Sequence, residues 1–141
     1  MHRHHDLRAR VSAGLIHASR IWRRRVDEAV APLGLTEATA FPLIHLHREG
    51  DGARQGAVAD TLGIEGPSLV RLLDQLCAAG LIERREDATD RRAKTLHLTM
   101  AGRDMAIRVE DVLNTVRKDV LGGLAETDLQ ACLRVFSAIQ P

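Results

Sequence analysis

The basic side chains of this 141-residue sequence gather in two short stretches. Four arginines lie within residues 20–25, and the second stretch contains Arg84, Arg85, Arg91, Arg92 and Lys94. The formal net charge is only +1, so binding to a nucleic acid would depend on where these side chains lie. Guanidinium groups bind phosphates and the edge of guanine. The second stretch is therefore a candidate DNA-binding surface, and we count Arg85 and Arg91 among its contact residues.

The segment DATDRRAKTLHLT, residues 87–99, joins a charged loop to an alternating strand. An aspartate two residues before an arginine, as in Asp90 and Arg92, can orient the guanidinium through a charge-assisted pair. An arginine held in this way can enter a narrow, electronegative minor groove. Lys94 shares a strand face with Leu96, so its stem can pack while its ammonium group reaches a phosphate. A solvated polar turn remains the alternative for residues 86–89.

A helix over residues 67–79 is the candidate that would read base edges. Proline suits the first turn and Gly80 the position after the last turn, while leucines at 69, 72, 73 and 76 form one buried stripe. In a helix-turn-helix the reading residues lie at the N-terminus of the second helix, which also favours a phosphate. Those residues are Gly66, Pro67, Ser68 and Arg71. Arg71 can form a bidentate contact with guanine, worth about 1–3 kcal/mol. The alternative is a solvated face on an ordinary core helix.

Periodicity and capping residues predict the elements that position these side chains. We expect helices over residues 6–31, 36–49, 54–62, 67–79 and 100–121, and a last one ending near residue 139. Thr36 and Thr99 are predicted N-caps, and Pro42 should kink or loosen its helix. Thr127 and Gln130 resemble a capping box. Residues 81–85 and 94–99 read as the two strands of a hairpin.

This order predicts a mainly α protein with a small β-hairpin, that is, a winged helix-turn-helix. The long flanking helices each carry an apolar face that the lobe does not use, so we expect a two-fold dimer through the N- and C-terminal helices. The expected organisation is an N-terminal dimerisation helix in residues 1–34, a DNA-binding lobe in residues 35–99 and C-terminal dimerisation helices in residues 100–141.

Composition disfavours several other classes of protein. No apolar run approaches the about 20 residues of a membrane span, and the polar N-terminus lacks the centre of a secretory signal, so we expect a cytoplasmic protein. Cys77 and Cys132 have no metal-ligand spacing, and reduced thiols are expected. The sequence contains three aromatic residues, too few for a platform that stacks single-stranded bases.

No enzyme or cofactor motif is found: there is no glycine-rich phosphate loop, no HExxH and no GxSxG. His45 and His47 are two apart on a helix and point to different faces. The N-terminal His2, His4 and His5 lack supporting carboxylates or cysteines, so we expect no metal site. A winged-helix module that acts mainly through protein contacts remains an alternative function, although the arginine-rich wing argues against it.

Three stretches resemble the MarR family of transcription regulators, and within it the SlyA-like branch: RIWRRRVDEAVAPLGLT (20–36), GIEGPSLVRLLDQL (63–76) and GLIERREDATDRRAKTLHLTMAGR (80–103). The resemblance implies a homodimer that reads a pseudo-palindromic operator on double-stranded DNA. It places the wing arginine that enters the minor groove at Arg92, and its aspartate partner at Asp90. Members repress transcription or antagonise other DNA-binding proteins, so a repressor is expected. A ligand-independent antagonist of a silencing protein is the alternative.

The resemblance also implies a small phenolic or aromatic carboxylate effector, bound between the dimer helices and the lobe. The candidate ligand residues are His17, Arg20, Trp22, Thr39 and His45. Arg20 could pair with a carboxylate and Trp22 could face a ring, although a tryptophan on an apolar stripe more often packs in a core. Relatives usually carry a large aromatic residue at the position of Ala40, so the identity of the ligand does not carry over. No cysteine precedes Cys77, which disfavours thiol-based sensing.

Overall fold

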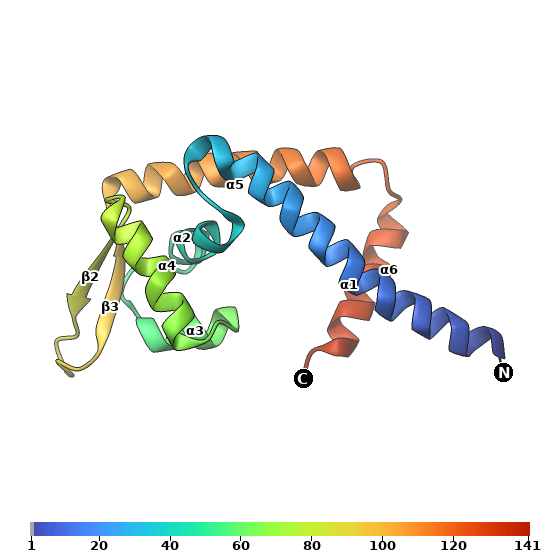
Figure 1. Ribbon diagram of the computed structural model, residues 1–141, viewed down its shortest axis with the longest axis horizontal. Coiled ribbons are helices and arrows are strands. Elements are labelled where there is room, and N and C mark those ends of the chain that lie inside the picture. Colours follow the sequence, from blue (N-terminus) through green and yellow to red (C-terminus); the bar gives the residue numbers. More distant parts are fainter. Residues whose placement is uncertain (1) are drawn as a thin grey trace.

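The computed structural model describes residues 2–141, with side chains described from residue 6 onward. Figure 1 shows the chain as a lobe at one end and long helices that extend from it. The elements, in chain order, are α1 (His2–Val30), the 3-10 turn η1 (Ala31–Leu33), α2 (Glu37–Glu49), β1 (Ala53–Arg54), α3 (Gln55–Leu62), α4 (Gly66–Ala78), β2 (Ile82–Glu86), β3 (Lys94–Leu98), α5 (Met100–Leu121) and α6 (Glu126–Ile139).

The break between α1 and α2 follows from a few residues. Gly34 takes a left-handed conformation, with φ of 78°, and ends the turn η1. Thr36 caps α2 as predicted: its hydroxyl accepts a bond from the backbone N–H of Thr39, and the Thr39 hydroxyl accepts one from the N–H of Thr36. Helix α2 then runs to Glu49 with Pro42 inside it. The chain therefore turns sharply from the long helix into the lobe.

The sheet has three strands, which corrects the prediction of a two-stranded wing. Its order is β1-β3-β2, and both pairings are antiparallel. The extra strand, β1, pairs Ala53 with Leu96 and Arg54 with Thr95. Arg54 was predicted to begin the following helix, which instead begins at Gln55. The third strand ties the root of the wing to the helix-turn-helix.

The predicted stripe of α4 is confirmed, because Leu69, Leu73 and Leu76 are buried and Leu72 is partly buried. These leucines join a core built from all parts of the lobe and from the inner ends of α1 and α5. The other core residues are Val26, Val30, Leu35, Ala40, Leu43, Ile44, Leu46, Val58, Ala59, Leu81, Ile82, Leu96, Leu98, Ala106, Val109 and Leu113. The core fixes α4 against the sheet and α2.

The two C-terminal helices differ in how they pack. Thr99 caps α5 as predicted, accepting a bond from the Gly102 N–H. Helix α6 begins at Glu126 after Ala125, which cannot cap with its side chain, so the predicted capping box at Thr127 is wrong. None of the α6 residues, all of which are described, is buried. Figure 1 shows α6 and the N-terminal half of α1 away from the lobe.

Within the described residues, no single helix has the length and apolar content to cross a membrane, and only residues 6–33 together with α2, joined at a bend of 78°, reach that length and composition.

Candidate nucleic-acid interface

The N-terminal turn of α4 presents its polar residues at the surface. Gly66, Pro67 and Arg71 are exposed and Ser68 is partly buried, as the predicted reading face requires. The N-cap residue Glu65 forms no side-chain bond to the first turn of this fully described helix. The backbone N–H groups of that turn are thus left for water or an anion. Arg71 forms no ion pair with any described residue.

The loop between β2 and β3, residues 87–93, presents Arg91 and Arg92 as exposed side chains. The loop is closed at its base by a bond from the Asp87 N–H to the Ala93 carbonyl, 3.1 Å. The Asp90 carboxylate accepts a bond from the backbone N–H of Arg92, 3.0 Å, and not from its guanidinium. The predicted orientation of the Arg92 guanidinium by Asp90 is therefore wrong in this structure. Asp90 shapes the turn that carries Arg92.

A set of bonds that the sequence did not predict connects Arg54 to Asp87 and Thr89 of this loop. The Arg54 Nε donates to Asp87 Oδ2 at 2.6 Å, and the Arg54 Nη2 donates to the Thr89 hydroxyl at 3.2 Å. The other oxygen of Asp87 accepts from both the N–H and the hydroxyl of Thr89. The Thr89 backbone bond, together with Arg54, holds the pKa of the Asp87 carboxyl below its ordinary value. The contact was missed because β1, which carries Arg54, was not predicted.

The remaining arginines and lysine of the wing divide into paired and weakly paired groups. Arg84 connects the wing to α4 and α3: it donates to Asp74 at 2.7 Å, to the Val70 carbonyl at 3.2 Å and to Gln55 at 3.3 Å. Arg85 contacts Glu83 at 3.4 Å, and the Lys94 ammonium lies 3.8 Å from Glu86. Arg84 thus has a structural role, while Arg85 and Lys94 remain accessible at the surface.

At the root of the wing, one carboxylate joins two elements. Asp51 accepts from the Leu98 N–H at 2.8 Å and from the Arg103 guanidinium at 2.6 Å. Burial acts to raise the pKa of Asp51, but these bonds outweigh it and hold the pKa below its ordinary value. The end of β3 and the start of α5 are therefore fixed to the turn after α2.

The predicted ligand residues differ in their exposure. His17 and Arg20 are exposed on α1, whereas Trp22 packs against the core. Thr39 is buried, and its hydroxyl is engaged in the cap of α2. His45 is partly buried. Of these five residues, His17 and Arg20 are the two that are fully exposed.

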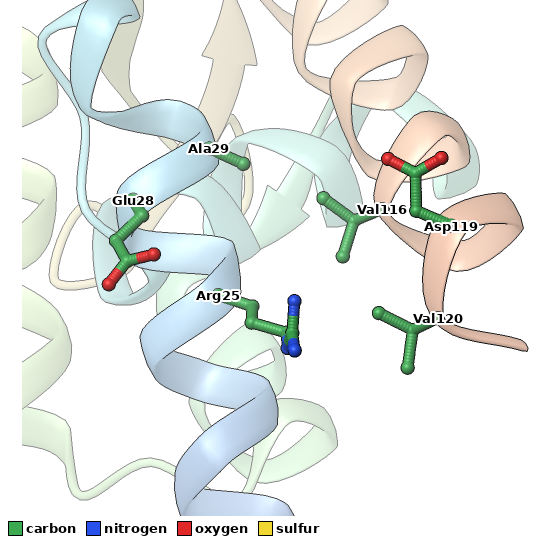
Figure 2. Close-up of a pocket in the computed structure, with 6 residues that line it drawn as sticks. All are labelled: Arg25, Glu28, Ala29, Val116, Asp119 and Val120. Atoms are coloured by element: carbon green, nitrogen blue, oxygen red, sulfur yellow. The ribbon is translucent and has the colours of Figure 1, made fainter.

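A different set of residues lines a hollow between α1 and α5. It has a volume of about 280 Å³ and is lined by Arg25, Glu28, Ala29, Val116, Asp119 and Val120. Figure 2 shows the Arg25 side chain reaching from α1 toward the valines of α5. The lining contains both signs of charge and none of the predicted ligand residues.

The described residues contain no group of three or more His, Cys, Asp or Glu side chains arranged to hold a metal ion. The side chains of His2, His4 and His5 lie outside the described residues. Burial raises the pKa of the partly buried Cys77 thiol, and Cys132 is exposed on α6.

Comparison with known proteins gives a consistent result. Residues 33–93 match the sequence model of the MarR family. The solved transcriptional regulator PA3341 is 38% identical, with 92% of this chain and 94% of that chain aligned and a TM-score of 0.81. CouR from Rhodococcus jostii RHA1, solved with bound p-coumaroyl-CoA, is 25% identical, with 92% and 90% aligned and a TM-score of 0.80.

MepR from S. aureus, solved as a complex with DNA, has the same fold. It is 22% identical to this chain, with 91% of this chain and 94% of that chain aligned and a TM-score of 0.84. The structural likeness includes the terminal helices as well as the winged lobe, because nearly the whole length of each chain is aligned.

Proposed function

Because this chain belongs to the MarR family of DNA-binding transcriptional regulators, we propose that it acts as a homodimeric repressor on a pseudo-palindromic operator. The stretches PSLVRLLDQL and DRRAK support placing it in the SlyA-like branch. Each subunit uses α4 in the major groove and the wing in the adjacent minor groove.

One observation carries the proposal: the exposed basic groups of α4 and of the wing belong to two elements that are bonded and packed together. Arg71 lies on α4, and Arg91 and Arg92 lie at the tip of the wing. Arg84 joins these two elements through its bonds to Asp74 and the Val70 carbonyl. Figure 1 shows α4 beside the two strands of the wing. Such a pair of elements can contact two grooves at once, with Gly66, Pro67, Ser68, Arg85, Asp90 and Lys94 as the supporting interface residues.

The dimer is supported by apolar side chains that one chain leaves uncovered. Helix α6 exposes Leu133, Val135, Phe136 and Ile139, and the N-terminal half of α1 exposes Leu7, Val11 and Ile16. Exposed apolar patches on a protein surface mark sites of interaction. A second copy that covers both helices would leave residues 35–99 of each chain as a DNA-binding lobe, with residues 1–34 and 100–141 in the interface.

The function is tested by fluorescence anisotropy with duplexes from the promoter region beside the protein's own gene. We expect one duplex to bind far more tightly than a scrambled sequence of the same length. Affinity should fall steeply as salt rises, because phosphate contacts release counterions. A protein that binds no duplex better than the scrambled control, even at low salt, contradicts the proposal.

We also propose a small anionic aromatic effector, either a free acid or its coenzyme A thioester. Two of the exposed side chains of α1, His17 and Arg20, would pair with its charge. The CoA-thioester ligand of CouR motivates the second form. The effector must bind one spacing of the two α4 helices better than another in order to change DNA affinity. Salicylate and p-coumaroyl-CoA, each added to the protein–DNA complex, test both forms; release by neither contradicts the effector.

A further inference from the structure

The wing carries acidic side chains at a position where the phosphates of bound DNA would repel them. Glu86, Asp87 and Asp90 lie in or beside the loop whose tip holds Arg91 and Arg92. Each carboxylate near the phosphates weakens DNA binding by like-charge repulsion unless it has another task. The Asp90 carboxylate is used in the backbone turn before Arg92. The other two acids, Asp87 and Glu86, differ in the bonds that they form.

Asp87 is the centre of a compact bonding pattern. One of its oxygens binds the guanidinium of Arg54, with Nε at 2.6 Å, and the other binds the N–H and hydroxyl of Thr89 at 3.1 and 3.2 Å. The same guanidinium also reaches the Thr89 hydroxyl. The Asp87 side chain is only 14% exposed, whereas that of Glu86 is 64% exposed and has a single weak contact, with Lys94 at 3.8 Å.

Arg54 comes from outside the loop, so these bonds join the loop to another part of the lobe. It lies on β1, directly before α3, and pairs with Thr95 of β3. Its guanidinium therefore connects the helix-turn-helix to the far end of the wing, beyond the last paired residues Glu86 and Lys94. Without it, the loop would keep only its internal bonds and the strands of the hairpin, and a two-stranded hairpin is marginally stable on its own.

We propose that Arg54 and Asp87 form a wing clamp, a pair of positioning residues that fixes the tip arginines at the angle and distance from α4 that DNA binding requires. The inference rests on the proposed DNA-binding function and adds residues outside the interface itself. Asp87 thus strengthens DNA binding although its negative charge repels phosphates. The loop is already ordered in the free protein, so binding DNA does not cost the free energy of ordering it.

The test compares two neighbouring carboxylates that carry the same charge. Asp87→Ala and Glu86→Ala each remove one negative charge from the wing. Electrostatics alone predicts that both variants bind DNA as tightly as the wild type or up to about twofold tighter. The clamp predicts this for Glu86→Ala only, and predicts that Asp87→Ala binds roughly fivefold or more weakly, the scale of losing hydrogen bonds to a charged group.

Two further readouts separate positioning from general loss of structure. The slope of log affinity against log salt should become shallower in Asp87→Ala and stay unchanged in Glu86→Ala, because a misplaced tip makes fewer phosphate contacts. Arg54→Gln combined with Asp87→Ala should bind no more weakly than Arg54→Gln alone, since the two residues act through one contact.

Hydrogen exchange, measured without DNA, tests the wing clamp independently of the proposed function. Hydrogen exchange of the dimeric wild type and the variants is followed in a peptide that spans residues 86–94. Faster exchange in Asp87→Ala and Arg54→Gln than in Glu86→Ala supports the clamp. Equal exchange in all three variants, or tighter DNA binding by Asp87→Ala, overturns it. If the wild type shows no sequence preference, the proposed function fails, and the exchange result still decides whether the clamp exists.

Discussion

At the scale of single residues, the structure divides the arginines of the lobe and of the start of α5 by their partners. Arg54, Arg84 and Arg103 each bind a carboxylate at 2.7 Å or less, whereas Arg71, Arg91 and Arg92 have no acidic partner among the described residues. A guanidinium already bound to a carboxylate has less to gain from a phosphate. The unpaired group is therefore the one we expect to contact DNA.

Replacing Arg92 by alanine should weaken operator binding by roughly 10-fold or more, because an arginine that reaches a groove contributes about 1–3 kcal/mol. Its exposed position at the tip means that dimerisation and melting temperature should not change. Anisotropy and thermal unfolding measure both quantities. Arg117→Ala, which removes an equal charge from α5, serves as the control. Equal affinity of Arg92→Ala and the wild type contradicts the wing's role in binding.

The sequence predicted the exposed tip arginines, because their charge and turn residues are local signals. It did not predict what the acids of the wing bind. Asp87 meets Arg54 across 33 positions of chain, and Asp90 meets a backbone N–H two residues away in place of the guanidinium. Both carboxylates had several oppositely charged neighbours within reach, so only the three-dimensional structure could select among them.

At the scale of elements, helices with a clear apolar period and a capping residue were predicted well, as for α2, α4 and α5. The strand β1 was missed because Ala53–Arg54 is too short to show alternation. The start of α6 was misplaced because Thr127 and Gln130 fit a capping box by type alone, while the helix had already begun at Glu126. Short or weakly patterned segments take their structure from their neighbours.

The start of α5 packs directly on the backbone before β2. A Cβ atom added at Gly102 would lie 1.9 Å from the Leu81 carbonyl oxygen, which already accepts the Thr99 N–H. Gly102→Ala should therefore destabilise the protein by about 1–3 kcal/mol, as overpacking does. A Cβ atom added at Gly56 in α3 would have no atom within 4 Å, so Gly56→Ala should leave the stability unchanged or raise it. Urea unfolding measures both, and equal midpoints for the two variants contradict this packing.

Helices α2 and α5 are joined by a pair that responds to pH. Arg48 binds both oxygens of Glu110, at 2.7 and 3.0 Å, and this bond holds the Glu110 pKa below its ordinary value. A depressed pKa means that the pair stabilises the fold above the ordinary pKa of about 4.3 and loses this effect as pH falls through the folded value. Glu110→Gln should thus cost about 1 kcal/mol or less at pH 7, since the arginine is half exposed.

The loss of stability caused by Glu110→Gln should depend on pH, and this dependence is what the experiment measures. Urea unfolding of the wild type and Glu110→Gln at neutral pH and again below pH 4 should show a difference that shrinks as acid is added. A difference that stays constant across this range would mean that the bond does not depend on the charge of Glu110.

At the scale of the whole molecule, one chain leaves apolar side chains of its terminal helices uncovered. The lobe shares its core with the inner parts of α1 and α5, but α6 buries none of its residues and the outer half of α1 leaves apolar side chains exposed. The periodicity of these helices predicts a partner. It does not predict how two copies would cross, because that geometry depends on the shape of both surfaces together.

Leu133 provides the sharpest test of this arrangement, because it is 63% exposed at the middle of α6 in a single chain. If α6 is covered by a second copy, Leu133→Glu places a charge in an apolar interface and should convert the dimer to monomers in analytical ultracentrifugation. Met100→Glu is the matched control: Met100 is 80% exposed and opens the segment 100–141 at the lobe end of α5, next to β3 and away from α6, so the variant should remain dimeric. The Leu133→Glu monomer should keep its folded lobe and lose most of its affinity for a two-half-site duplex, since each lobe then binds alone. A Leu133→Glu protein that remains dimeric, or a wild type that is monomeric, would show that α6 is covered in some other way.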